Sequence, residues 1–550
     1  MLNCKKLIKD IKLNIKALAS LVLIMSYPLM MIVVIGWFLI PHLMPYLREV
    51  VAFVFFTSVF IGLILVAKSV VLKKWVMIFS LWMLSVFAFV KLGFYYVFGA
   101  KLSSSSVFVF FETNYNEASE FISSYFDAKL IVLAFFSFIY PILYSCIIGF
   151  NLKKFYLSSF HLHSNKIRLL SVLLIFLSVI ALQRRFKAES IVFTLSKSIE
   201  EYKETKANIR KDLAQETNPN LSVIANKTDS QVGVVIIGEA TSRWHMQLYG
   251  YNRETNPLLM EIKDELLVFN DVIAPNVMTI RSLEKALTLK CYEGFDVENN
   301  FSVVQLANQS DFETFWISNQ EPVGYTESIP TIIGSAAKTK EFIATDDYSH
   351  TIYDENLLPR INSALKSKEG RKIIFVHLIG THRVYSKRYP DEYSHFKGVN
   401  ERTKYKTEYS KDKVNEYDNA IRYNDYVVRE IIEQVRSMNE NSFVVYFSDH
   451  GDDVFDTQDF VGHHGNKASK PMHDIPFLAW FSESYKLKNP RFDSIFNNLD
   501  KPHALEDFIY GFSDLIDVDY KAYDSSRSIF NKDYKIKTRW IRNEIDYDKW

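Results

Sequence analysis

The sequence predicts a membrane domain of five transmembrane helices followed by an α/β domain outside the bilayer. The first 185 of its 550 residues are mostly apolar, and the remainder has an ordinary soluble composition. From Ser230 onward, strand-like runs alternate with helical stretches, which indicates a layered α/β fold. We therefore expect a five-span domain over residues 1–185, a linker with a charged or amphipathic helix over 186–229, and the external domain over 230–550.

Five stretches are apolar enough to cross a bilayer, which takes about 20 residues each. They lie at residues 17–40, 51–72, 75–100, 130–150 and 169–183. The fifth stretch is short, but the arginines at its ends can reach the interface with their long side chains. No small-residue cleavage site follows the first stretch, so it is not read as a signal peptide.

Basic residues set the orientation of the chain through the positive-inside rule. Lysines precede the first stretch, and further basic clusters separate the second from the third and the fourth from the fifth. With the N-terminus in the cytoplasm, all three clusters are cytoplasmic. An odd number of spans then exports everything after Arg185, and the polar loop 101–129 lies on the same outer side.

The composition limits the partners and the redox chemistry of the chain. A formal net charge of +1 and a pI of about 7.7 imply no bulk attraction to nucleic acid. Of the three cysteines, only Cys291 falls in the external domain, so that domain has no internal disulfide. Cys291 is either a nucleophile or, as we favour, a small buried apolar side chain. The charged helix-forming segment 196–216 is either a solvated linker helix or lies on the membrane.

Two apolar runs of the external domain end in candidate metal ligands. The run 232–237 is followed by Glu239, and the run 443–447 is followed by Asp449 and His450. Such runs predict strands of a parallel sheet buried on both faces, and α/β sheets place their chemistry beyond the carboxyl ends of strands. Carboxylate and imidazole ligands suit zinc.

Simpler interpretations exist for each of these residues. Asp449 could cap a following helix while His450 packs in the core, and Glu239 could be an acid favoured by a helix N-terminus. Thr279 stands at the start of a predicted helix, where a threonine is an ordinary N-cap. Bound to zinc at a helix N-terminus, however, its hydroxyl would become a usable nucleophile.

Three further histidines follow predicted strands or lie in turns flanked by glycine. They are His382, His463 and His464. Each alone is more often a surface or hydrogen-bonded core histidine. Together they could supply phosphate-binding charge, a proton relay or a second metal site.

The motifs around these residues resemble those of bacterial phosphoethanolamine transferases. The stretch from Ile237-Gly-Glu239 through Tyr-Gly250-Tyr to Thr-Asn-Pro257 is similar to the family's opening motif, and Asp449-His-Gly-Asp452 to its second. Tyr417-Asp-Asn and Arg388-Tyr-Pro390 fit as well, and the resemblance covers nearly the whole length. It implies a sulfatase-like, alkaline-phosphatase-type catalytic domain in the periplasm and a multi-pass anchor in the bacterial inner membrane.

The resemblance also implies roles for individual residues. Those that match the zinc ligands are Glu239, Thr279, Asp449 and His450, and Thr279 matches the residue that becomes phosphoethanolaminylated. Those that match the histidines on the donor phosphate are His382 and His464, with His463 as the alternative to His464. Those that match membrane-domain residues facing the active site are Thr113 and Glu117. One zinc ion is implied, with a second as an open alternative.

The implied reaction moves phosphoethanolamine from phosphatidylethanolamine to a lipopolysaccharide acceptor, a core sugar or lipid A. Because the external domain lacks the disulfides of the lipid A-modifying members, the chain resembles more closely the subgroup acting on core sugars or glucans. The alternatives are transfer to periplasmic glucans and a phosphoglycerol transferase of the same fold.

Two rivals are less favoured. A sulfatase needs a C/S-x-P-x-R motif, which the segment beginning at Cys291 lacks. A non-catalytic anchor or transporter is disfavoured because the spans contain few ionisable residues, chiefly Lys68 and Lys91.

Overall fold

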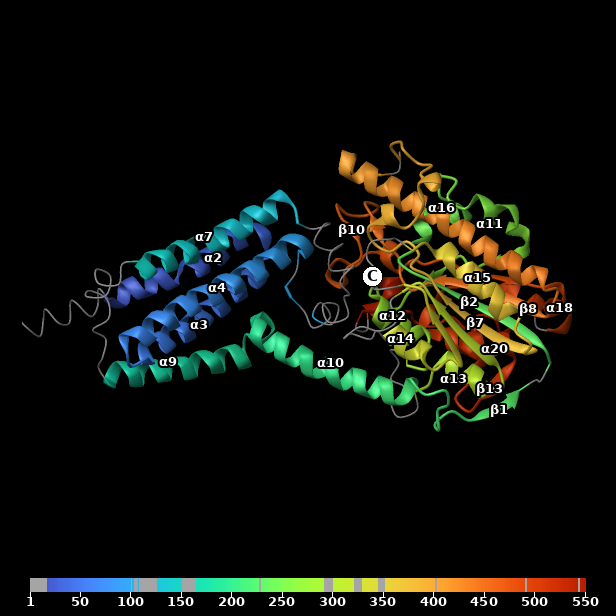
Figure 1. The fold of residues 1–550 in the computed structure, drawn as a ribbon, viewed down its shortest axis with the longest axis horizontal. Coiled ribbons are helices and arrows are strands. Elements are labelled where there is room, and N and C mark those ends of the chain that lie inside the picture. The colour runs from blue at the N-terminus through green and yellow to red at the C-terminus, as the bar shows by residue number, and fades with distance from the viewer. Residues whose placement is uncertain are drawn as a thin grey trace, which may run out of the picture. The chain divides into compact units, whose positions relative to one another are not determined.

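The computed structural model divides into two compact units, and the division falls within one helix, after Lys203. The residues that the structure describes are 17–99, 101–102, 107, 126–150, 165–226, 229–290, 300–320, 329–344, 352–400, 403–489, 492–542 and 545–550. Figure 1 gives the course of the chain. The predicted residues Thr113, Glu117 and Cys291 lie outside the described part.

The first unit, called the membrane unit below, consists of long apolar helices. Its labelled helices are α2 (Tyr27–Leu39), α3 (Leu43–Val66), α4 (Val70–Phe98), α7 (Ala128–Phe150) and α9 (Asn165–Arg184). Within the described residues, four of these are long and apolar enough to cross a membrane, namely all but α2. The stretch Ala17–Met25 and α2 form a pair bent by 43°, which makes a fifth candidate if it is one span. A helical membrane domain of four or five apolar helices is therefore confirmed.

Several helices begin before the predicted spans, and paired charges explain the largest of these differences. We expected a span to begin at residue 51, but α3 begins at Leu43 and includes Arg48 and Glu49. These two charges lie near the start of an apolar helix because each has a partner, Glu189 and Lys91 respectively. Helix α4 likewise starts at Val70 instead of residue 75.

The linker contains a long helix, as the sequence predicts. The short turn η1 (Lys187–Glu189) is followed by α10 (Ile191–Leu213). At the C-terminal end of α10, Ile209 and Leu213 belong to a hydrophobic core of the second unit. These two side chains therefore pack on the second unit, whereas Arg210 and Lys211 beside them are exposed.

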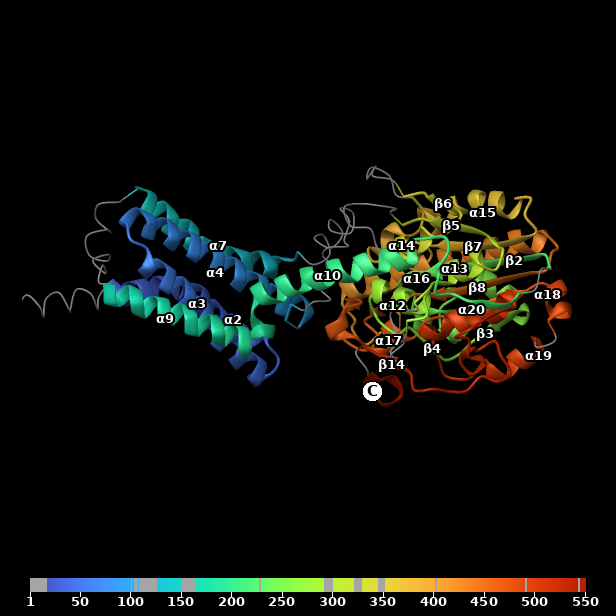
Figure 2. The ribbon, with the colours of Figure 1, turned by 90° about the horizontal axis from the view of Figure 1, so that it is seen from below.

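The second unit, called the catalytic unit below, is built on a seven-stranded sheet with the order β3-β11-β8-β2-β7-β5-β6. Its strands are β2 (Gln231–Gly238), β3 (Leu266–Val268), β5 (Glu313–Ser318), β6 (Thr339–Phe342), β7 (Arg371–His377), β8 (Ser442–Ser448) and β11 (Phe477–Phe481). Strand β11 pairs antiparallel with both its neighbours, and the other pairings are parallel. Figure 2 shows the strands in this order, from β6 at one edge to β3 near the other.

Helices cover both faces of the sheet (Figure 1). Successive side chains of a strand point to opposite faces, so each buried strand contributes to both cores. Val235 and Ile237 of β2 pack in one core, and Val234 and Ile236 in the other. The helices on the first face are α12 (Thr279–Ala286), α13 (Val303–Asn308), α14 (Ile329–Gly334) and α20 (Phe508–Ile516). Those on the second are α11 (Pro257–Glu261), α15 (Leu358–Leu365) and α16 (Glu408–Ser437). The predicted α/β layers are confirmed.

Shorter elements complete the unit. The helices are α17 (Lys470–His473), α18 (Glu483–Lys488) and α19 (Phe492–Ile495). The short strands pair as β1 (Val223–Asn226) with β13 (Val518–Tyr520), β4 (Val272–Ile273) with β12 (His503–Ala504), β9 (Asp453–Val454) with β10 (Val461–Gly462), and β14 (Trp540–Ile541) with β15 (Ile545–Asp546).

The register of the three central strands brings their carboxyl ends together. Gly238 of β2 pairs with Ser448 of β8, and Ile237 pairs with His377 of β7. The residues that follow these strands, among them Glu239 and Asp449, therefore leave the sheet side by side at one edge.

Candidate active site

Glu239 directly follows Gly238, the last residue of β2, and its backbone is tightly held. The side chain is 1% exposed. Ala240 has a positive φ of 56°, a strained conformation for a residue with a side chain, and its N–H donates to Asp449 Oδ1 at 3.1 Å. Gly380 has a φ of +52°, and a Cβ there would lie 2.8 Å from the Glu239 backbone nitrogen and oxygen. The fold therefore fixes the direction in which Glu239 leaves the sheet.

Asp449 follows β8 and does not cap a helix, so the capping alternative is wrong. Its Oδ1 accepts from the N–H groups of Ala240 and His450, at 3.1 and 2.7 Å. The next element along the chain is the strand β9. Asp449 Oδ2 is buried, and no hydrogen-bond partner contacts it among the described residues. One carboxylate oxygen is thus left facing the interior of the site.

His450 is fully buried, and its ring is oriented by its own loop. Nδ1 lies 3.0 Å from the Gly451 carbonyl oxygen, and because a carbonyl only accepts, Nδ1 carries the proton. A neutral ring then leaves its lone pair on Nε2, which lies 3.2 Å from both Thr279 Oγ1 and Glu239 Oε1. This is the orientation that a metal-binding histidine adopts when a carbonyl holds its other nitrogen.

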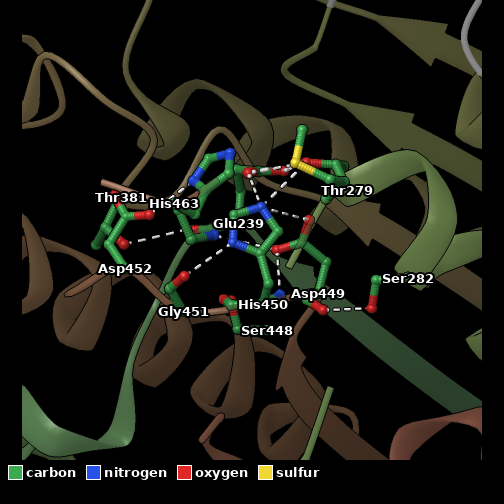
Figure 3. A network of polar contacts seen from close by, with 12 residues as sticks. Glu239, Thr279, Ser282, Thr381, Ser448, Asp449, His450, Gly451, Asp452 and His463 are labelled. Atoms are coloured by element: carbon green, nitrogen blue, oxygen red, sulfur yellow. Dashed lines mark hydrogen bonds and ion pairs between the residues drawn. The ribbon is translucent and has the colours of Figure 1, made fainter. Parts of the chain in front are cut away.

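Thr279 is the first residue of α12 and is not its N-cap, which is Met278. The Thr279 hydroxyl lies 3.3 Å from each carboxylate oxygen of Glu239 and 3.2 Å from His450 Nε2. Ser282, one turn further along α12, donates to the Asp449 carbonyl and ties the helix to that strand end. The N-cap interpretation of Thr279 is therefore wrong, and Figure 3 shows the hydroxyl pointing into the carboxylate and histidine cluster.

The electrostatics of this cluster fit a bound cation. Burial alone would raise the pKa of Glu239, but the hydrogen bond and charge of His450 hold it well below its usual range. Burial and the charge of Glu239 raise the pKa of Asp449 far above its usual range. Burial would lower the pKa of His450, but Asp449 and Glu239 raise it to about 10. Two buried carboxylates this close need positive charge between them, supplied either by protons or by a metal ion.

The donor set matches zinc in number and kind. Ligand atoms of Glu239, Asp449 and His450 lie within 4.8 Å of one another, and Thr279 Oγ1 is in contact with two of the three residues. Two carboxylates, one imidazole nitrogen and one hydroxyl give four ligands, and the unsatisfied Asp449 Oδ2 is one of them. The residues present therefore fit the metal that the sequence implies.

His463 lies beside this cluster. Its ring centroid is 4.0 Å from that of His450, and its Nδ1 is 2.7 Å from Asp452 Oδ1. The hydroxyl of Tyr385 donates to the other oxygen of Asp452 at 2.6 Å. His450, Asp452 and His463 form a second group with metal-ligand spacing.

The other two predicted histidines are also near the site. His464 is buried, and burial together with the charge of His463 lowers its pKa to about 3. His382 follows β7, and its charge helps to keep the pKa of Glu239 low. All three histidines predicted from sequence thus lie on loops at the edge of the sheet that carries Glu239.

Sequence reasoning missed several supporting residues. Thr381 donates from its hydroxyl to the Glu239 carbonyl at 3.1 Å, and the Tyr417 hydroxyl donates to the Ala240 carbonyl at 2.7 Å. Tyr417 and Asp452 lie within motifs that were noticed, so a signal existed for both. Tyr385 lies in the short turn η7 (Tyr385–Lys387), and nothing in its local sequence marks it.

Comparisons with known proteins agree with this geometry. The family model for sulfatases matches residues 231–518. The phosphoethanolamine transferase EptC of Escherichia coli is 32% identical to this chain over 525 residues, covering 85% of the chain and 89% of that relative.

Solved structures match both parts of the chain. The C-terminal periplasmic domain of Escherichia coli EptC in complex with zinc matches with a TM-score of 0.57 and 33% identity, covering 60% of this chain and 97% of that domain. The integral membrane protein lipooligosaccharide phosphoethanolamine transferase A of Neisseria meningitidis matches with a TM-score of 0.64, covering 93% of this chain and 98% of that one. At 16% identity, the latter likeness shows a shared fold alone.

Proposed function

We propose that this chain, which belongs to the phosphoethanolamine transferases of the sulfatase family, takes phosphoethanolamine from phosphatidylethanolamine and passes it to a lipopolysaccharide acceptor by way of Thr279. The observation that carries the proposal is the Thr279 hydroxyl, which lies 3.2 to 3.3 Å from Glu239 and His450 at the N-terminus of α12. This hydroxyl contacts groups that can bind a metal and makes no bond to its own helix, which is the arrangement expected of a nucleophile.

The chain's own residues would divide the work as follows. Glu239, Thr279, Asp449 and His450 would hold one zinc ion, which when bound supplies positive charge that favours the alkoxide of Thr279 and offsets charge on the phosphoryl oxygens. In the first step a bond forms between Thr279 Oγ and the donor phosphorus, and the bond from phosphorus to the diacylglycerol oxygen breaks. In the second step an acceptor hydroxyl attacks the same phosphorus and releases Thr279.

The three histidines would line the donor phosphate. Burial lowers the pKa of His463 below its usual value and lowers that of His464 to about 3, which favours neutral rings before substrate arrives. An incoming phosphate would raise these pKa values, because a nearby negative charge favours the imidazolium form. Asp452 would hold the His463 ring through Nδ1. His382 would line the phosphate from the loop that follows β7. The described residues leave open a second zinc ion in the group formed by His450, Asp452 and His463.

The donor and the location belong together. The domain of Escherichia coli EptC that this unit resembles is periplasmic. We propose that this domain is periplasmic too, and that the chain is a multi-pass inner-membrane protein whose N-terminus is cytoplasmic. Attachment to the membrane would keep the site near a donor that cannot leave the bilayer, which raises its effective concentration.

Intact mass spectrometry of the full chain in detergent tests the threonine intermediate. Incubation with phosphatidylethanolamine should add one phosphoethanolamine to the wild type and none to Thr279→Ala. Thr288→Ala is a matched control, because this threonine lies just after the same helix and donates to the Glu284 carbonyl. No adduct on wild type, or an adduct that persists in Thr279→Ala, would sink the proposal.

Headgroup-labelled lipids and acceptor analysis test the rest. Label from phosphatidylethanolamine, and not from phosphatidylglycerol, should appear on Thr279; the reverse would identify a phosphoglycerol transferase. Mass spectrometry of lipopolysaccharide and of periplasmic glucans from cells with and without the chain should place the added group on a core sugar or lipid A. Its appearance on glucans alone would support the alternative acceptor.

A further inference from the structure

A second network of buried charges lies in the catalytic unit, centred on His245. This residue ends the short turn η2 (Arg243–His245), belongs to the same loop as Glu239, and is 2% exposed. Its Nδ1 lies 2.6 Å from Asp418 Oδ1, and its Nε2 lies 3.1 and 3.2 Å from the two oxygens of Asp456. Asp418 is fully buried, whereas the side chain of Asp456 is 17% exposed.

The contacts require His245 to carry a positive charge. A carboxylate faces each ring nitrogen, and a neutral imidazole has only one N–H to donate. Burial would lower the pKa of His245, but the charges and hydrogen bonds of Asp456 and Asp418 raise it to about 10. Asp418 also accepts from the Tyr251 hydroxyl at 2.9 Å and from Arg253 Nη1 at 2.6 Å. Two carboxylates thus face two cations, and the network is electrically balanced.

On the Asp418 side, the network is joined to the loop that carries Glu239. Asp418 lies on α16 directly after Tyr417, whose ring packs edge-on against His245 at 5.0 Å. The Tyr417 hydroxyl donates to the Ala240 carbonyl and accepts from the Ser242 N–H, at 2.7 and 2.8 Å. His245 and Tyr417 therefore hold both ends of the segment that follows Glu239.

On the Asp456 side, the network is joined to the hairpin that carries His463. Asp456 lies in the turn between β9 and β10, and its Oδ2 accepts from the Val454 N–H at 3.0 Å. These strands share only two residue pairs, so backbone pairing alone holds the hairpin weakly. Asp452 precedes β9 and His463 follows β10. The hairpin that the contact between His245 and Asp456 helps to hold therefore carries both Asp452 and His463.

We propose that His245, as an imidazolium between Asp418 and Asp456, is a positioning residue that sets the place of His463 relative to Glu239 and so governs binding of the donor phosphate. This inference rests on the proposed function, in which His463 lines that phosphate. His245 itself touches none of the four candidate zinc ligands through any contact described above, so its effect is on geometry and not on the metal.

The test uses the full chain in detergent with phosphatidylethanolamine as donor. His245→Gln should raise the donor KM by about tenfold, the size of a typical coupling between neighbouring charged groups, while the zinc content stays at the wild-type level. Asp456→Asn should raise the KM in the same way, and because its side chain is partly exposed, loss of folding is less expected than for His245→Gln. In the double variant His245→Gln/Asp456→Asn, two neutral amides face each other, and the KM should return toward the wild-type value.

A purely structural role predicts a different pattern. It would lower the melting temperature of each variant without recovery of the KM in the double variant, and that result would overturn the proposal. An unchanged KM in Asp456→Asn would also overturn it. Glu433→Gln is the matched control, because it removes a carboxylate of helix α16 whose ion pairs, among the described residues, are with Arg429 and Arg436 of the same helix. If the wild type forms no Thr279 adduct, the proposed function fails. If the wild type forms the adduct but the His245 and Asp456 variants keep the wild-type KM, only the role of His245 is refuted.

Discussion

Each unit of the chain contains a cluster of buried charges, and the two clusters are balanced differently. In the membrane unit, Lys91 donates to Glu49 and to the Glu189 carbonyl, and Arg48 pairs with Glu189 at 2.8 Å. Every carboxylate there faces a cation of the chain. In the catalytic unit, Glu239 and Asp449 both face the imidazole of His450, at 3.2 and 3.4 Å, and no hydrogen bond from the described residues reaches Asp449 Oδ2.

The difference separates a structural cluster from a reactive one. Burying a charge is costly unless another charge compensates for it, so a complete set of partners indicates a network that serves the fold. An incomplete set indicates that something outside the chain supplies the missing charge. By this criterion the membrane cluster is complete, whereas the catalytic cluster needs further positive charge, either from protons or from a bound cation.

Removal of the metal should have the largest effect. A chelator should abolish formation of the Thr279 adduct, and added zinc should restore it, because without the cation the Thr279 hydroxyl loses the charge that activates it. Thermal unfolding should also shift downward, since a ligand at a thousand times its Kd stabilises a fold by about 4 kcal/mol. Inductively coupled plasma mass spectrometry with an adduct assay measures both. Full activity in metal-free protein would contradict a role for a metal ion in the catalytic cluster.

The substitution Lys91→Met should have the largest effect in the membrane unit. It leaves the buried carboxylate of Glu49 without its cation, and breaking such a pair costs about 3 to 5 kcal/mol. Thermal unfolding of the detergent-solubilised chain measures this loss. The double variant Lys91→Met/Glu49→Gln should recover most of it, because no unpaired charge remains. If the single variant is as stable as the wild type, the cluster is not a structural one.

High pH should weaken the His245 network, which is balanced like the membrane cluster but lies in the catalytic unit. The pKa of His245 is raised from its ordinary 6.5 to about 10 by Asp456 and Asp418, against the effect of burial. Because the folded-state pKa is the higher one, the stabilisation is fully present below pH 6.5 and is lost as the pH rises toward 10.

The groups that face His245 are Asp418 and Tyr417 of α16, Asp456 of the hairpin turn, and Tyr251 of its own loop, with Arg253 on the far oxygen of Asp418.

The unfolding free energy of wild type minus that of His245→Gln, measured between pH 6 and 10, should fall with pH by a few kcal/mol, on the scale of about 1.4 kcal/mol per unit of pKa shift. A difference that does not vary with pH would contradict a charged His245.

The substitution Arg48→Gln should have the smallest effect. The Arg48 side chain is 47% exposed, so water replaces much of what its pairing with Glu189 provides. We expect a loss of about 1 kcal/mol or less in thermal unfolding, well below that of Lys91→Met. A loss as large as that of Lys91→Met would show that exposure does not separate the two pairs.

Local sequence patterns predicted much of the fold and the candidate site. The apolar runs before Glu239 and Asp449 are buried strands because unbroken β-branched and aromatic residues can lie in a sheet covered on both faces. The boundary of α3 was not predictable in the same way, since Arg48 and Glu49 look unfavourable in a span until their partners Glu189 and Lys91 are known.

The sequence by itself determined the two kinds of domain, the strand ends that carry Glu239, Asp449 and His450, and the family. These follow from hydropathy, from the spacing of apolar residues and from sequence motifs, all of which depend on residues near one another in the chain. Only the tertiary structure decided that Thr279 turns its hydroxyl away from its helix, that the ring of His463 lies tilted against that of His450, and that His245 joins three segments. Those facts depend on contacts between residues far apart in sequence, and packing, not local preference, brings such residues together.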